Sequence, residues 1–317
     1  MNLSKRRFLK WLIGASGTSA VGITAYRLLG PGADISSAPG LSGGGGLSEL
    51  APEQILSEAP NQLEFLDEFG WTEADLEAVR LDSKKMQSPD RYAEGDVFLP
   101  SEFRQALPSA LARLNRAQGY YGHGFFNIVG FKQLFETAGK TTEIGRFSID
   151  ELGLLQWLFF EDAKNFGFKG PKVSMDFLAG FTSGQVHYER QFGQFLFREK
   201  AKPLWERMRK DIGRDLILTS GARALPKQCG LFLAKLMDSQ GNVSLASRSL
   251  APPGYSFHGS GDFDVGSRHL GDENFTHLFA RSDVFRRMQG LAYIELRYPA
   301  GNRFGVRFEP WHVKVGS

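Results

Sequence analysis

The stretch Leu216-Ile217-Leu218-Thr219-Ser220-Gly221-Ala222-Arg223 marks the point where the pattern of this 317-residue chain changes. It begins with a short apolar run that is typical of a strand, and a polar turn follows. From about Trp71 to Asp211 the pattern is mostly helical, whereas strand signals appear after Asp211. The sequence therefore predicts an α+β fold, in which a mostly helical region precedes a small antiparallel sheet with flanking helices.

Local signals predict helices on both sides of this stretch. Ser148 and Glu151 make a capping box, which begins a helix. Pro226 suits the first turn of another helix, because proline is tolerated where the backbone N–H has no helical partner. Two further helices are predicted at about residues 203–212 and 282–289.

The end of the chain is predicted to form a β-hairpin. Residues 291–298 and 304–308 have the character of strands, and the segment between them carries proline, glycine and asparagine. Strict alternation in the second strand places its apolar side chains on one face and Arg307 and Glu309 on the other.

Composition limits the class of protein. Hydrophobic residues make up 42% of the chain, enough to bury the core of one large domain or two. The formal net charge is only +3, so the composition gives no indication of a nucleic-acid partner. The one cysteine, Cys229, excludes an internal disulfide framework, and the oligomeric state does not follow from the sequence.

The first 30 residues resemble an export signal or an N-terminal anchor. Basic residues precede an apolar stretch at residues 11–26. The run from Ser4 to Lys10 also resembles the twin-arginine export motif, with Lys5 where the first arginine would stand. We therefore expect a periplasmic or cell-envelope protein, exported through the twin-arginine or the general route. Both a cleaved signal and a retained membrane tether through residues 11–26 remain open.

Two later segments supply the groups of a split metal site. Ala251-Pro252-Pro253-Gly254-Tyr255-Ser256-Phe257-His258 ends in an imidazole, and the carboxylates Asp262 and Asp264 follow it. Glu309-Pro310-Trp311-His312 supplies a second imidazole and another carboxylate. Three such ligands and one open position are what a hydrolytic zinc ion needs, because the open position holds the attacking water.

Three motifs in this order resemble those of a known family. Ser220-Gly221-Ala222-Arg223 with Gln228 resembles a Ser-Gly-Tyr-Arg stretch and its following glutamine. The segment 251–258 resembles Pro-Pro-Gly-x-Ser-x-His, and the segment 309–312 resembles a closing Glu-x-x-His. The family is that of the zinc D-alanyl-D-alanine carboxypeptidases, the VanY-like LAS metallopeptidases, which trim peptidoglycan stem peptides. The resemblance covers about residues 211–317.

The resemblance implies a role for each matching residue. His258 and His312 are expected to bind zinc, and Glu309 is expected to activate the attacking water as the catalytic base. Arg223 is expected to face the scissile carbonyl and to stabilise the oxyanion. Contacts with the substrate are expected from Ser256, Gln228 and Trp311.

The third metal ligand is the point where the chain departs from the family pattern. The family usually has an aspartate seven residues after the histidine, and Val265 occupies that position here. Asp264 is one residue short of it and Asp262 is three residues short. The ending Asp264-Val265-Gly266 resembles the family motif and favours Asp264. Asp262 remains the alternative, either as a ligand or as a group that orders a ligand histidine.

These observations divide the chain into four predicted parts. Residues 1–30 are the export signal or anchor, and residues 31–60 are a flexible linker rich in Gly, Ser and Pro. Residues 61–210 are the mostly helical region, and residues 211–317 are the zinc peptidase domain. We expect a metallo-carboxypeptidase that hydrolyses D-Ala-D-Ala or related bonds of stem peptides. The alternatives are a cross-bridge endopeptidase and a non-catalytic peptidoglycan-binding envelope protein.

Overall fold

The computed structural model describes residues 85–86 and 88–316. The predicted export segment, the predicted linker and the start of the helical region therefore lie outside the described residues. Among the helices that the structure does describe, none is both long enough and apolar enough to cross a membrane.

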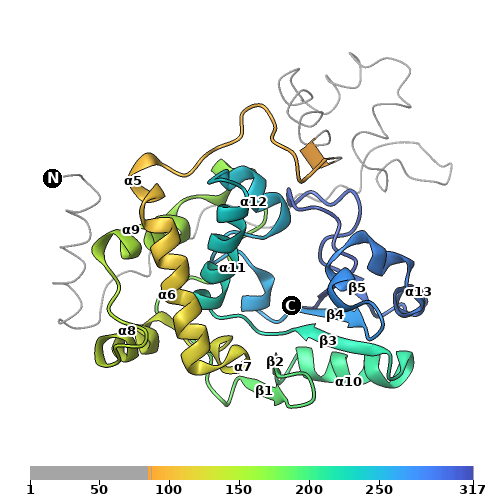
Figure 1. The fold of residues 1–317 in the computed structure, drawn as a ribbon. Helices are drawn as coiled ribbons and strands as arrows, with labels where there is room; N and C mark the ends of the chain where they lie inside the picture. Colours follow the sequence, from red (N-terminus) through yellow and green to blue (C-terminus); the bar gives the residue numbers. More distant parts are fainter. Residues whose placement is uncertain (1–84, 87, 317) are drawn as a thin grey trace, which may run out of the picture. The chain divides into compact units, whose positions relative to one another are not determined.

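Helices dominate the described chain up to Phe166, as Figure 1 shows. The capping box predicted at Ser148 is confirmed: its hydroxyl accepts a hydrogen bond from the Glu151 amide, and the Glu151 carboxylate accepts one from the Ser148 amide. In chain order the elements are α5 (Ser101–Arg104), α6 (Ala106–Tyr121), α7 (His123–Phe126), α8 (Phe131–Lys140), α9 (Ile149–Phe160) and the 3₁₀ turn η2 (Ala163–Phe166).

A small hairpin follows that was not predicted from the sequence. Strands β1 (Val186–Glu189) and β2 (Gln194–Phe197) pair antiparallel, and Gly193 before β2 has a φ of +65°, which favours glycine. Helix α10 (Ala201–Ile212) comes next, close to its predicted bounds. The hairpin contributes to the site below, because the carbonyl of Phe195 contacts the turn after the next strand.

The predicted α+β class is confirmed by a four-stranded antiparallel sheet in the described residues, with strand order β3-β4-β6-β5. Figure 1 labels β3, β4 and β5 of this sheet. The strands are β3 (Leu216–Ser220), β4 (Phe263–Ser267), β5 (Glu295–Leu296) and β6 (His312–Lys314). The remaining elements are α11 (Leu225–Asp238), α12 (Val243–Ser249), η3 (Phe257–Gly259), η4 (Gly271–Phe275), η5 (His277–Arg281) and α13 (Asp283–Gln289).

The predicted C-terminal hairpin is wrong in its second strand. Residues 304–308 form no strand, and β5 pairs instead with β6, which begins after Pro310. The reason lies in the partners of the loop backbone. The Phe304 carbonyl accepts from the Lys169 amide at 2.8 Å, and the Arg307 amide donates to the Arg248 carbonyl at 2.8 Å. The loop is therefore bound to the helical side of the protein and not to β5.

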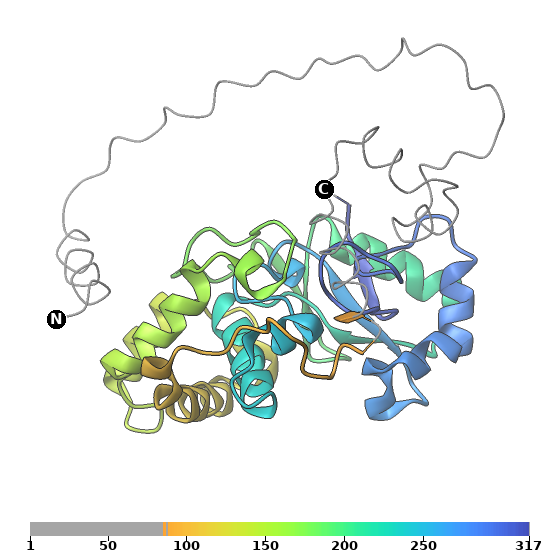
Figure 2. The same ribbon diagram turned by 90° about the horizontal axis from the view of Figure 1, so that it is seen from above.

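The described residues contain two large apolar cores. The first core joins α6, α9 and α11, and the second packs α10 and α13 against the sheet. Figure 2 shows α6, α8 and α9, in yellow and green, on the side opposite α13. Phe263, Val265 and Val313 point into the second core. Because side chains alternate along a strand, Asp264 and His312 project from the other face.

We predict that Glu151→Gln lowers the free energy of unfolding by about 3 kcal/mol, because it breaks a buried ion pair. The Glu151 carboxylate accepts two hydrogen bonds from Arg113, at 2.7 and 3.1 Å. Burial acts to raise the pKa of Glu151, but the hydrogen bonds from Arg113 and from the Ser148 amide lower it below its ordinary value of 4.5. The stabilisation should therefore be complete above that ordinary value and be lost as the pH falls through the lowered one.

Urea denaturation at a series of pH values measures this difference, with exposed Glu143→Gln as the control. An equal loss of stability in the two variants, or a loss that persists in strong acid, would contradict the prediction.

Candidate metal centre

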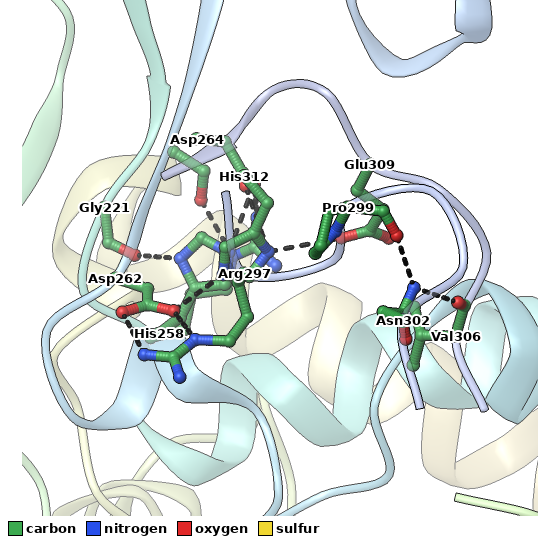
Figure 3. Close-up of polar contacts among 12 residues, drawn as sticks. Gly221, His258, Asp262, Asp264, Arg297, Pro299, Asn302, Val306, Glu309 and His312 are labelled. Carbon is green, nitrogen blue, oxygen red and sulfur yellow. Dashed lines mark hydrogen bonds and ion pairs between the residues drawn. The ribbon is translucent and has the colours of Figure 1, made fainter. Parts of the chain in front are cut away.

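Three buried side chains converge from three elements. His258 lies in η3, Asp264 in β4 and His312 at the start of β6. The sheet register makes Asp264 the partner of both Ser220 and His312. One nitrogen or oxygen atom from each of the three side chains lies within 4.8 Å of the other two. Figure 3 shows this convergence.

The ring of His258 is oriented by a backbone carbonyl. Its Nδ1 lies 2.8 Å from the Gly221 oxygen, to which it must donate, so that Nε2 is left as the acceptor (Figure 3). Nε2 lies 3.2 Å from Asp264 Oδ2. A β-carbon on residue 221 would lie 1.9 Å from the Phe195 oxygen. Only glycine therefore allows β2 to pack against the turn that holds His258.

The ring of His312 is oriented by Asp262. The His312 Nε2 lies 3.1 Å from Asp262 Oδ2, and Arg297 donates to both oxygens of that carboxylate, at 2.7 and 3.1 Å (Figure 3). The Val315 amide donates to Asp262 Oδ1 at 2.9 Å. Histidines that bind metals usually have such a partner on the second nitrogen. Asp262 therefore lies behind His312, in the position of an orienting group.

With Nε2 held by Asp262, His312 presents Nδ1 to the other two carboxylates. Nδ1 lies 3.2 Å from Glu309 Oε2 and 3.6 Å from Asp264 Oδ1. The Glu309 amide donates to the Tyr298 carbonyl at 3.0 Å, which fixes the backbone next to Pro310. Glu309 is 6% exposed. The predicted base thus lies beside a predicted ligand.

The carboxylate of Asp264 has one oxygen engaged and one without a donor. Oδ2 accepts from Arg223 Nη2 at 2.6 Å. Oδ1 is buried and has no hydrogen-bond partner within the described part of the chain. Buried polar atoms are rarely left in this state, because the loss of hydration is costly. A cation at Oδ1 would satisfy the atom, so the site fits a metal ion.

The charges of the cluster also favour a cation. Asp262, Asp264 and Glu309 are three buried carboxylates, and Arg223 and Arg297 oppose two of them as permanent charges. With neutral histidines these five groups together carry one net negative charge.

The pKa shifts follow from this arrangement. Burial and the charge of Arg223 lower the pKa of His258 to about 4. Burial also acts to lower the pKa of His312, but hydrogen bonds with Asp262 and Glu309 raise it to about 9. Burial raises the pKa of Glu309. Burial acts to raise the pKa of Asp264, but its interactions with His258 and Arg223 hold that pKa well below its usual range. The cluster is therefore an environment that stabilises a positive charge near His312.

Gln228 connects two of the sequence motifs. Its Nε2 donates to the Arg223 carbonyl at 2.8 Å, and its Oε1 accepts from the Gly254 amide at 2.9 Å. It thereby joins the turn after β3 to the Pro-Pro-Gly segment before His258. Only its second amide hydrogen and second lone pair remain for a substrate.

The predicted site residues other than Asp262 line one cavity of about 350 Å³. They are Arg223, Gln228, Ser256, His258, Asp264, Glu309, Trp311 and His312. The ligand, base and substrate roles assigned to them from sequence stay predictions.

Several residues of the site were not predicted from the sequence. Arg297 orients Asp262, and Ser249, Tyr298, Arg307 and Lys235 are among the further residues that line the cavity. The sequence carries no local signal for Arg297, because Asp262 lies 35 positions before it. Arg307 and Tyr298 were assigned to a hairpin that does not form.

Comparison with known proteins agrees with the motifs. Residues 195–316 match the VanY family, described as D-alanyl-D-alanine carboxypeptidase. No protein of curated function matches the sequence.

Solved structures of several peptidases are similar to part of this chain. The LdcB LD-carboxypeptidase is 24% identical over 47% of this chain and 67% of its own, with a TM-score of 0.33. A mutant of the vancomycin-resistance D,D-pentapeptidase VanY, solved in complex with Zn(II), is 20% identical over 41% and 77%, with a TM-score of 0.33. VanYB with D-alanine-D-alanine is 20% identical over 43% and 79%, with a TM-score of 0.34.

Proposed function

We propose that this chain, whose residues 195–316 match the VanY family, is a metal-dependent carboxypeptidase acting on the D-Ala-D-Ala ends of peptidoglycan stem peptides. The family match supports the hydrolysis of a peptide at its carboxyl end. The observation that carries the proposal is the convergence of His258, Asp264 and His312 beside the buried Glu309 in one cavity.

Zinc is the metal that this donor set fits best, because two imidazole nitrogens and one carboxylate oxygen are common ligands of catalytic zinc. The atoms that would hold it are His258 Nε2, His312 Nδ1 and Asp264 Oδ1. The Gly221 carbonyl and Asp262 engage the other ring nitrogens of the two histidines, Asp264 Oδ1 has no partner in the described chain, and a metal at His312 Nδ1 would replace the hydrogen bond with Glu309. When bound, zinc lowers the pKa of a water molecule and polarises the scissile carbonyl.

The chain's own residues supply the proton transfers and the fixed charge. Glu309 accepts a proton from the attacking water and delivers it to the leaving amine. Arg223 lines the cavity and is held by Asp264 and by the Ser220 hydroxyl, which accepts from its Nε at 2.8 Å. A cation fixed in this way needs no reorganisation to stabilise a developing oxyanion. Ser256 and Trp311 line the same cavity and are proposed to contact the peptide.

The charges of the cavity favour a carboxypeptidase over a cross-bridge endopeptidase. Arg223, Lys235 and Arg307 all line it, and a peptide's free carboxyl end brings a negative charge that a bond inside a cross-bridge lacks. A different observation disfavours the alternative of a non-catalytic peptidoglycan-binding protein. The short His-to-Asp spacing still leaves His258 Nε2 only 3.2 Å from Asp264.

We further propose that the protein is exported to the periplasm or cell envelope, where its substrate is located. The support is the basic and apolar pattern of residues 1–30, together with the linker composition of residues 31–60. A membrane tether through residues 11–26 is part of this proposal. A fusion of residues 1–60 to a reporter, fractionated between periplasm, membrane and cytoplasm, tests it.

The function is tested by incubating the zinc-loaded protein with a stem pentapeptide ending in D-Ala-D-Ala and measuring the product masses. We expect a product lighter by one alanine residue and free D-alanine. Cleavage restricted to cross-linked dimers would identify an endopeptidase. No cleavage of either substrate by protein that holds one zinc per chain would rule out the proposed function.

A further inference from the structure

Three residues that line the cavity each carry a buried polar atom without a partner. The atoms are Ser249 Oγ, Tyr298 OH and Arg307 Nε, and none has a hydrogen-bond partner among the described residues. Ser249 is 5% exposed and Tyr298 is 2% exposed. Folded proteins contain few such atoms. Three such atoms on residues that line one cavity therefore suggest a place where polar atoms of a ligand are received.

Backbone contacts connect these residues to one another and to the metal centre. The Arg307 amide donates to the carbonyl of Arg248, the residue before Ser249, at 2.8 Å. The Tyr298 carbonyl accepts from the Glu309 amide, two residues after Arg307. The rings of Tyr298 and His312 meet edge to face, with centroids 5.0 Å apart. All three unpartnered groups are thus tied to the segment 307–312.

The chemistry of the three groups is that of hydrogen-bond donors around a positive charge. Two are hydroxyls, and the third is a guanidinium N–H. The ion pair of Arg307 is loose, because its Nη1 lies 3.8 Å from the carboxylate of Asp90, which is 64% exposed. That contact leaves Nε unpaired. Several donors with one cation suit a carboxylate, which accepts through two oxygens.

We propose that Ser249, Tyr298 and Arg307 form a carboxylate-binding subsite for the peptide, separate from the atoms assigned to the metal and the scissile bond. This inference rests on the proposed function. A stem peptide can bring a carboxylate from two sources, its free C-terminus or a carboxylated side chain on the acyl side of the scissile bond. The donor chemistry is the same for both, and the substrate set below separates them.

The test measures the binding of three peptides by calorimetry to the zinc-loaded Glu309→Gln chain, which keeps the cavity but removes the proposed base. The first peptide has a side-chain carboxylate next to D-Ala-D-Ala, the second has that side chain amidated, and the third has a C-terminal amide. We expect Arg307→Met in this background to weaken binding of the first peptide roughly ten- to hundredfold. Arg307→Met should not weaken the binding of the peptide that lacks the recognised carboxylate. That is the second peptide if the subsite holds the side-chain carboxylate, and the third if it holds the C-terminal one.

Two controls separate recognition from structure. Arg303→Met removes an exposed arginine of the same loop and should leave the three affinities unchanged. Ser249→Ala and Tyr298→Phe remove atoms that have no partner in the described chain, so they should weaken binding without lowering the melting temperature of the peptide-free protein.

Each outcome decides a different point. If no peptide binds before Arg307 is changed, the proposed function fails. If the peptides bind and Arg307→Met weakens all three equally or none of them, the subsite is wrong while the proposed function stands. A fall in melting temperature with unchanged affinity in Ser249→Ala and Tyr298→Phe assigns those hydroxyls to folding and also overturns the subsite.

Discussion

Glu309→Gln is expected to lower kcat by about two to four orders of magnitude while the chain retains one metal ion. The substitution keeps the shape of the side chain but removes its capacity to accept a proton. Glu309 is not one of the three proposed ligands, so metal binding should persist. Turnover of a D-Ala-D-Ala peptide and elemental analysis of the same sample measure the two quantities.

The matched control is Glu295→Gln. Glu295 lies on the neighbouring strand β5 and pairs with Lys314 in an exposed position, so its loss should leave kcat and metal content unchanged. Wild-type turnover in Glu309→Gln would refute the assigned base. Loss of metal together with activity would instead identify Glu309 as a ligand.

The second large effect is expected from Asp264→Asn, compared with Asp262→Asn. Both substitutions remove one buried carboxylate next to a histidine and leave one arginine without its partner. If Asp264 is the ligand, Asp264→Asn should abolish stoichiometric zinc binding and turnover. Asp262→Asn should keep the metal with an affinity reduced about 10- to 100-fold, as is usual for a group that orients a ligand.

Zinc titration against a chelating indicator measures both affinities, and circular dichroism verifies that both variants are folded. The reverse order of affinities would make Asp262 the ligand and would reinstate the alternative that the sequence leaves open. If both variants lost zinc binding completely, the two carboxylates would act as one unit, contrary to the separate roles of ligand and orienting group.

The sequence predicted those helix starts that are set by residues within the helix itself. The capping box at Ser148 and the proline at position 226 act within one helical turn, so both helix starts were predictable. The structure of residues 304–308 was not predictable in this way. The apolar side chains that were predicted to share one face pack in different cores, Phe304 and Val306 in the first and Phe308 against the second. The partners of the backbone are also not local. Lys169 and Arg248, far away in sequence, hold that backbone.

Part of the candidate site was likewise predictable from local motifs, and part of it depends on a residue that is distant in sequence. His258, Glu309 and His312 stand in motifs whose spacing is visible in the sequence, and the structure brings them together. The difference between Asp262 and Asp264 was not predictable, because alternation places both on one face. It follows from Arg297, which contacts Asp262 and thereby keeps it behind His312.

The first apolar core has a consequence for engineering. It contains Phe257, next to one proposed ligand, and Tyr298 and Val306 from the loop before another, together with side chains of α6 and α9. The groups that would perform the chemistry are therefore not a transplantable module. A chimera that inherits only residues 211–317 would carry every motif of the reaction but would lose the helices against which two of its loops pack.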